Sequence, residues 1–292
     1  MLTRHRLFAC ASALVLTTSL IAPMAHAGGK DFAIYTTRLG GDTETAQPYV
    51  DRFAAFLESS PEWNKSATGL KGRFLSSKKE VQTYIDTQKP GFGVLEPWLY
   101  FEMKKQHQLE AVAQVESSDL NASRLHVIVK DPAIKSLDDL KGKRLWTHLA
   151  ESPQYLAQVA LDGKVASVAT QFQLKQVGNA MKAARAVLRG ETDAAIVDDE
   201  QLAAAKKLEG GEALRSVFAS SPQPPVSVVI FGGVTPAAVD KKVLAKSLIS
   251  LCGTPKGAEI CKEMHITKFV PLNAALFTAA EKRYESTGGA KK

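Results

Sequence analysis

The sequence predicts an α/β protein with two lobes, each a mostly parallel sheet flanked by helices. Three observations favour this fold class. Strand and helix signals alternate along the chain, which is typical of βαβ units. Two such series are joined by long apolar strand signals, "SRLHVIVK" at 123–130 and "VSVVIFGG" at 226–233. The chain of 292 residues is also long enough to bury two medium-sized cores.

The first series contains four strand signals and three helix signals. Apolar residues at Tyr49, Phe53 and Phe56 repeat at helical spacing. Ser77 suits an N-cap, and Pro97 suits the first position of a helix. The strands are expected at 30–39, 70–76, 91–96 and 110–115, and the helices at 45–59, 77–86 and from Pro97 onward.

The second series has the same character and is followed by a helical C-terminus. A short helix capped by Ser136 precedes a strand ending near Trp146. The chain leaves the first lobe near Ser118 and returns near Pro225, which predicts lobes at 28–118 with 230–292 and at 119–229, with a cleft between them. Further strands are expected at 172–177, 194–198 and 213–220, and helices at 153–161, 179–189, 236–251, 255–264 and 273–284.

Residues 1–27 read as a secretory signal peptide. Arg4 and Arg6 give a positive start, an apolar stretch follows at 7–21, and "AHA" at 25–27 is a small-x-small cleavage site. The apolar stretch is too short and too interrupted to form a membrane-spanning helix. We therefore expect cleavage after Ala27 and a periplasmic protein.

Composition and motifs exclude several function classes. The net charge is +7, and no cluster of Lys and Arg is interleaved with aromatic residues, so nucleic acid is not an expected partner. The histidines lack the spacing of metal ligands, and neither Gly-x-Ser-x-Gly nor a phosphate-binding Gly-rich loop is present. We expect no catalytic residues, no metal and no cofactor, and a monomeric chain.

Two cysteines remain after the signal peptide, Cys252 and Cys261. The segment "CGTPKG" breaks the helix between them, so two short helices can fold back at this corner. An even number of cysteines in an exported protein favours a disulfide. The alternative is a pair of buried thiols in packed helices.

Several stretches together resemble type 2 periplasmic substrate-binding proteins, and most closely the phosphate/phosphite/phosphonate-binding (PhnD-like) family of ABC transporters. The resemblance covers nearly all of 30–285. It implies a cleft between two α/β lobes that close by a hinge, and a small polar solute, a phosphonate-like oxyanion, delivered to a membrane permease by transient contact. The matching stretches are "EPWLY" (96–100), "SLDDLKGKRLW" (136–146), "VLRGETDAAIVDDEQL" (187–202), "SSPQPP" (220–225) and "TPKGAEICKEMHITKFVPLN" (254–273).

The resemblance carries ligand contacts onto a small set of positions. His148 is added on the sequence alone, because it is a polar residue at a predicted strand end that faces the expected cleft. Each position has a structural alternative: the hydroxyl and carboxylate residues suit helix caps, the tyrosines suit a core, and a lone histidine suits a solvated or packed site. The expected ligand-binding residues are Tyr35, Thr36, Pro97, Tyr100, His148, Ser152, Asn179 and Asp198.

The sequence departs from the family pattern where the anion would bind. Glu96 replaces the Gly of a Gly-Pro-x-x-Tyr turn, and Glu151 adds a second negative charge. The stretch "ESPQY" supplies one hydroxyl at the start of the helix, that of Ser152, and Pro153 removes one backbone N–H. These changes disfavour a phosphonate and favour a cationic, zwitterionic or neutral polar ligand. The alternatives to an importer component are a sensor of such a solute and a secreted enzyme on the same fold.

Overall fold

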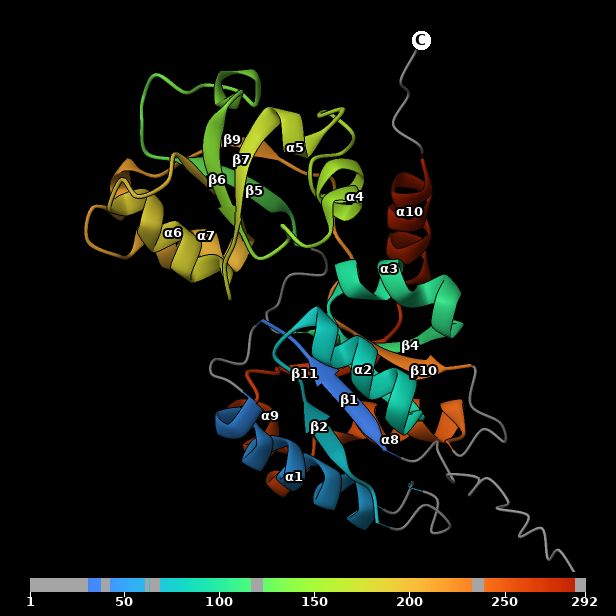
Figure 1. The fold of residues 1–292 in the computed structure, drawn as a ribbon. Helices are drawn as coiled ribbons and strands as arrows, with labels where there is room; N and C mark the ends of the chain where they lie inside the picture. The colour runs from blue at the N-terminus through green and yellow to red at the C-terminus, as the bar shows by residue number, and fades with distance from the viewer. Residues whose placement is uncertain are drawn as a thin grey trace, which may run out of the picture.

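The structure is a computed structural model that describes residues 31–37, 43–60, 63, 69–116, 123–232 and 239–286. The strands within these residues form two sheets, one of six strands and one of five. Figure 1 shows each sheet in its own lobe with helices packed around it. The predicted two-lobed α/β architecture is confirmed.

The six-stranded sheet has the order β11-β4-β10-β3-β1-β2. β1 pairs in parallel with β2 and β3, as predicted. The other half is antiparallel, because β10 returns from the second lobe and enters between β3 and β4, and β11 then adds beside β4. The strands are β1 (Phe32–Tyr35), β2 (Gly72–Phe74), β3 (Phe92–Leu95), β4 (Leu109–Glu116), β10 (Ser227–Phe231) and β11 (Lys268–Pro271).

The five-stranded sheet repeats this plan with the order β7-β6-β8-β5-β9. β6 is parallel to β7 and β8, whereas β5 is antiparallel to β8 and β9. The antiparallel pairs again involve the strands that lead into and out of the lobe. The strands are β5 (Leu125–Val129), β6 (Lys143–Thr147), β7 (Phe172–Gln176), β8 (Ala194–Asp198) and β9 (Arg215–Ala219).

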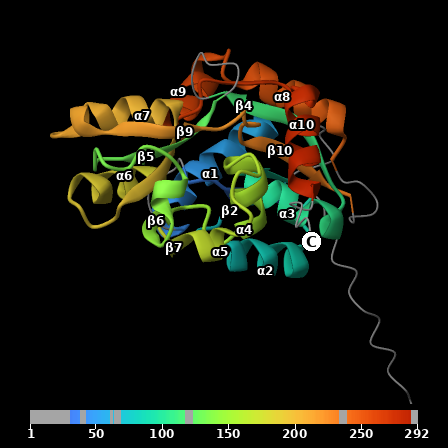
Figure 2. The same ribbon diagram turned by 90° about the horizontal axis from the view of Figure 1, so that it is seen from above.

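The helices cover both faces of the six-stranded sheet. One apolar cluster buries α1, α8 and α9 against one face, and a second joins α2, α3 and α10 to the other face and continues into the second lobe. Figure 2 shows α10 beside α3 and α4 at the junction of the lobes. The helices are α1 (Thr43–Ser59), α2 (Lys78–Gln88), α3 (Pro97–His107), η1 (Asp138–Leu140), α4 (Pro153–Tyr155), η2 (Leu156–Ala160), α5 (Val168–Gln171), α6 (Ala180–Leu188), α7 (Asp199–Lys206), η3 (Gly211–Ala213), α8 (Lys241–Leu251), α9 (Pro255–Glu263) and α10 (Ala274–Glu285).

Two connections between the sheets lie side by side at Ser123 and Gln223. One leads from β4 into β5, and the other leads from β9 into β10. They meet where the backbone N–H of Gln223 donates to the carbonyl of Ser123 over 2.8 Å. β10 begins at Ser227 and belongs to the six-stranded sheet. The lobe ranges 28–118 with 230–292 and 119–229 stay a prediction.

The corner between α8 and α9 carries the expected disulfide. Cys252 and Cys261 are bonded, with their Cα atoms 5.8 Å apart. Thr254 caps α9 by accepting a hydrogen bond from the backbone N–H of Gly257. A Cβ atom at Gly257 would lie 1.9 Å from the carbonyl oxygen of Leu251, so only glycine fits this turn.

The predicted signal peptide, residues 1–27, lies outside the described residues. Among the described helices, none is both long enough and apolar enough to cross a membrane.

Candidate functional site

A cavity of about 570 Å³ opens between the two sheets, within the size range of small-molecule sites. The first lobe contributes the β3–α3 turn and the ends of β4 and β11, and the second contributes β5, residues 148–155 and the β8–α7 turn. Both crossings, at Ser123 and at Gln223, also line the cavity. A solute in this space would therefore contact both lobes and the hinge.

Acidic side chains dominate the charge of this cavity. Among the described residues, its lining contains four carboxylates but only one lysine or arginine, Lys268. The Lys268 ammonium group lies 3.3 Å from the carboxylate of Glu116, so a neighbour already balances its charge. The other three carboxylates belong to Glu96, Asp198 and Glu200. The cavity thus favours a positively charged group.

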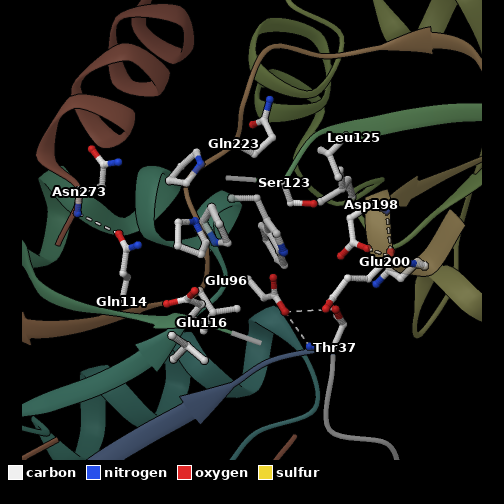
Figure 3. Close-up of a pocket in the computed structure, with 18 of the residues that line it drawn as sticks. Thr37, Glu96, Gln114, Glu116, Ser123, Leu125, Asp198, Glu200, Gln223 and Asn273 are labelled. Carbon is white, nitrogen blue, oxygen red and sulfur yellow. Dashed lines mark hydrogen bonds between the residues drawn. The ribbon is translucent and has the colours of Figure 1, made fainter. Parts of the chain in front are cut away.

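Glu96 is held rigidly at the start of α3. It is the N-cap residue, but its side chain does not cap the helix. Its Oε1 atom instead accepts hydrogen bonds from the hydroxyl of Thr36 at 3.0 Å and from the backbone N–H and hydroxyl of Thr37 at 2.8 and 3.1 Å. Figure 3 shows the other carboxylate oxygen directed toward the cavity. This oxygen is a preorganised acceptor for a solute.

The negative charge of this region also acts on a neighbouring tyrosine. Burial raises the pKa of Tyr35, and the charges of Glu96 and Glu151 raise it further. Glu96 comes from the first lobe and Glu151 from the second, so carboxylates of both lobes act at one point. The Tyr35 phenol therefore stays neutral at physiological pH.

The helix starts around the cavity use their own side chains as acceptors. Asp198 caps α7 by accepting from the backbone N–H of Gln201, and the Gln201 side chain accepts from the Asp198 backbone N–H in return, each over 2.8 Å. Asn179, outside the cavity lining, caps α6 in the same way by accepting from the Lys182 N–H over 2.9 Å. α3 begins with Pro97, which has no N–H. These helix starts leave few backbone donors for an oxyanion.

Neutral amide groups and apolar surface form the rest of the wall. Gln114 accepts a hydrogen bond from the backbone N–H of Asn273 over 2.9 Å, which leaves its NH₂ group as a donor (Figure 3). Tyr155 donates from its hydroxyl to Gln223 over 3.2 Å, and its ring stacks on Phe101 of α3. The wall therefore offers hydrocarbon contact and a neutral donor beside the carboxylates.

Three of the residues predicted from the sequence line this cavity: Pro97, His148 and Asp198. Thr36 lies one layer behind it, bonded to Glu96. Asn179 is a half-buried helix cap outside the lining. All five stay predictions as solute contacts.

The other three predicted residues are buried away from the cavity lining. The ring of Tyr35 meets the edge of Trp98, with ring centroids 5.6 Å apart. Tyr100 packs against the ring of Phe277 at 5.7 Å. Ser152 is buried ahead of α4 and makes no side-chain capping bond. As solute contacts these three residues also stay predictions.

Sequence reasoning missed the wall formed by β4 and β11. Gln114, Glu116, Lys268 and Asn273 lie together there because β11 pairs antiparallel with β4. The stretch "KFVPLN" was not expected to form a strand, because the four residues of β11 are too few to show an alternating pattern. The acidic departure at Glu96, in contrast, was visible in the sequence.

Solved structures support the same fold. A binding protein component of an ABC phosphonate transporter from Pseudomonas aeruginosa is 14% identical, with 90% of each chain covered and a TM-score of 0.65. PhnD1 from Prochlorococcus marinus, in complex with methylphosphonate, is 12% identical over 88% of this chain and 97% of its own, with a TM-score of 0.65. The aliphatic sulphonate binding protein SsuA from Escherichia coli is 13% identical over 88% and 90%, with a TM-score of 0.53.

The family comparison covers most of the chain. No curated protein sequence matches this chain. The family model described as "ABC transporter, phosphonate, periplasmic substrate-binding protein" matches residues 53–277. The chain is a periplasmic solute-binding protein that delivers a small molecule to an ABC importer, and it belongs to the phosphonate-type family of these proteins.

Proposed function

We propose that the solute of this importer component carries a positive charge, either alone or as part of a zwitterion. The observation that carries the proposal is the charge of the cavity: Glu96, Asp198 and Glu200 line it, while its Lys268 is paired with Glu116. A cationic group would satisfy the open oxygen of Glu96 with a charge-assisted hydrogen bond. A solute of this class fits a cavity whose described lining has more carboxylates than lysine or arginine side chains.

The helix starts support the same choice. A phosphonate needs several donors, because each of its oxygens accepts two or three hydrogen bonds. The Asp198 side chain already caps the start of α7, and Pro97 has no N–H to donate at the start of α3. An oxyanion would also lie close to the carboxylates that line the cavity, and repulsion between like charges is costly in a shielded cleft.

The neutral parts of the wall favour a zwitterion over a bare cation. The NH₂ group of Gln114 would donate to a carboxylate, carbonyl or phosphonyl oxygen of the solute, while Glu96 holds the cationic end. Leu125, Leu149 and Tyr155 would contact a hydrocarbon portion. A small amine that also carries a hydrocarbon portion and an oxygen acceptor would contact Glu96, the apolar wall and Gln114 at the same time.

The remaining features of the proposal concern the protein as a whole. It acts as a monomer, contacts its permease transiently and catalyses no reaction. The leader is cleaved after Ala27, and the lobes are 28–118 with 230–292 and 119–229. Thr36 and Tyr35 act through Glu96 and Trp98, the lining residues that they contact. Tyr100, Ser152 and Asn179 stay predictions as solute contacts.

A thermal-shift screen of residues 28–292 tests the charge of the solute. Its arms are small amines, amino acids, betaines, phosphonates, sulfonates and inorganic phosphate, all at equal ionic strength. A solute at one hundred times its Kd stabilises the native state by about 2.7 kcal/mol, a rise of roughly 5–10 °C in Tm for a chain of this size. We expect the rise in the amine or zwitterion arms. A rise confined to methylphosphonate, sulfonates or phosphate would contradict the proposal.

A further inference from the structure

The C-terminal helix α10 contacts both lobes. On the side of the first lobe, Glu281 forms a salt bridge with Lys104 of α3. Phe277 packs its ring against Tyr100 of the same helix, with centroids 5.7 Å apart. The helix follows β11 directly, so its start is fixed to the six-stranded sheet.

The end of α10 is bonded to the second lobe. The side-chain amide of Gln154 in α4 donates to the carbonyl oxygen of Tyr284 over 2.7 Å. The hydroxyl of Ser286 lies 3.3 Å from Oε1 of Gln158 in η2. The lobes are therefore linked by α10 as well as by the two chain crossings, as the position of α10 in Figures 1 and 2 shows.

Arg283 lies at the centre of this link. Its guanidinium group donates to the carbonyl oxygen of Pro222 over 3.2 Å and lies 3.7 Å from the carboxylate of Asp162. Both charged side chains are largely shielded, with 23% and 18% of their areas exposed. Shielding of this kind strengthens a charged pair relative to one in open solvent.

Asp162 extends the link to the hinge crossing. Its other carboxylate oxygen accepts from the backbone N–H of Ser221 at 2.6 Å and from the Ser221 hydroxyl at 3.0 Å. Asp162 itself has a φ of 49°, a left-handed conformation that its surroundings must hold in place. Ser221 and Pro222 directly precede Gln223, Pro224 and Pro225, which line the cavity.

We propose that Arg283 is a positioning residue for solute binding. From a helix anchored in the first lobe, it holds Pro222 of the return crossing and, through Asp162, the turn after η2 in the second lobe. The hinge therefore has a third connection, which limits how far the lobes separate and fixes the crossing that forms one wall of the cavity. This role does not depend on the charge of the solute.

The test uses the solute-free protein, so it is independent of the solute class. Arg283→Gln removes the charge, and Arg52→Gln is the matched control, because Arg52 pairs with Glu263 on the exposed surface of the first lobe. Hydrogen exchange in a peptide covering 220–226 should be about tenfold faster in Arg283→Gln, since a charge-assisted contact no longer opposes local opening. Exchange in β8 and in the control should not change.

Solution scattering separates lobe positioning from local stability. Arg283→Gln should have a larger radius of gyration than the parent chain and the control, because the third connection is released. Faster exchange at 220–226 with an unchanged scattering profile would overturn the proposal, since Arg283 would then stabilise the loop alone. Unchanged exchange would overturn it as well. If Arg283→Gln does not fold, Asp162→Asn breaks the same link and must give the same pair of changes.

Discussion

Replacing Glu96 with glutamine removes one negative charge from the cavity and keeps the shape of the side chain. The new amide oxygen can still accept from the Thr36 hydroxyl and the Thr37 N–H, which now bond to Oε1 at 3.0 and 2.8 Å. Stability should therefore fall by no more than about 1 kcal/mol, the value of a neutral hydrogen bond. The loss of a bond to a charged partner is larger, about 1.5–3 kcal/mol, so the Kd for a cationic solute should rise roughly 10- to 150-fold.

Isothermal titration calorimetry measures this difference, with the best amine or zwitterion from the screen as titrant. Glu110→Gln is the matched control, because Glu110 pairs with Lys241 and its side chain is 59% exposed. Its affinity should stay within about twofold of the parent, since exposed charges are screened by salt. Equal or tighter binding by Glu96→Gln would refute the assignment of Glu96 as the cation acceptor.

Three further predictions concern stability. Reduction of the Cys252–Cys261 disulfide should lower Tm, because the free energy of unfolding falls by about 2–3 kcal/mol in the chain-entropy model. A thiol titration of the non-reduced protein should find no free thiol at these positions, and two titratable thiols would contradict the prediction. Ser152→Ala should lower the free energy of unfolding, measured in urea, by less than the ~1 kcal/mol of a lost helix cap, because the Ser152 hydroxyl makes no capping bond. A larger loss of stability would contradict this prediction. A hydrogen bond from Arg144 lowers the pKa of Asp193, so the pair should stabilise the fold above the unfolded pKa of about 3.9 and lose that effect as the pH falls through the lower folded value. Asp193→Asn should be less stable than the parent at pH 7, by up to about 1 kcal/mol for so exposed a pair, and the difference should vanish near pH 2; a constant difference in calorimetry would argue against the linkage.

Local patterns in the sequence predicted most of the elements. Ser77 and Pro97 mark the starts of α2 and α3, and the apolar run at 194–198 is the buried strand β8. The antiparallel halves of the sheets were not predicted, because a strand's direction depends on where the chain re-enters the sheet. β11 was not predicted, since four residues carry too little pattern to identify a strand.

The cavity was predicted only in part, for the same reason. Glu96 and Asp198 adjoin clear helix starts, so their positions at strand ends could be read from the sequence. Gln114 and Asn273 are 159 residues apart and meet only through the pairing of β4 with β11, which no local pattern shows. The burial of Tyr100 against Phe277 depends in turn on the packing of α10.

Titration of the wild-type protein with three related probes tests the charge of the solute most directly. Propylamine carries the cation alone, methylphosphonate carries the anion alone, and 2-aminoethylphosphonate carries both. The carboxylates of the cavity predict that adding the amine to the phosphonate tightens binding at least about tenfold, the effect of one charge-assisted hydrogen bond. They also predict that this gain is lost in Glu96→Gln. Methylphosphonate binding as tightly as 2-aminoethylphosphonate, with no response to propylamine, would contradict a cation-binding cavity.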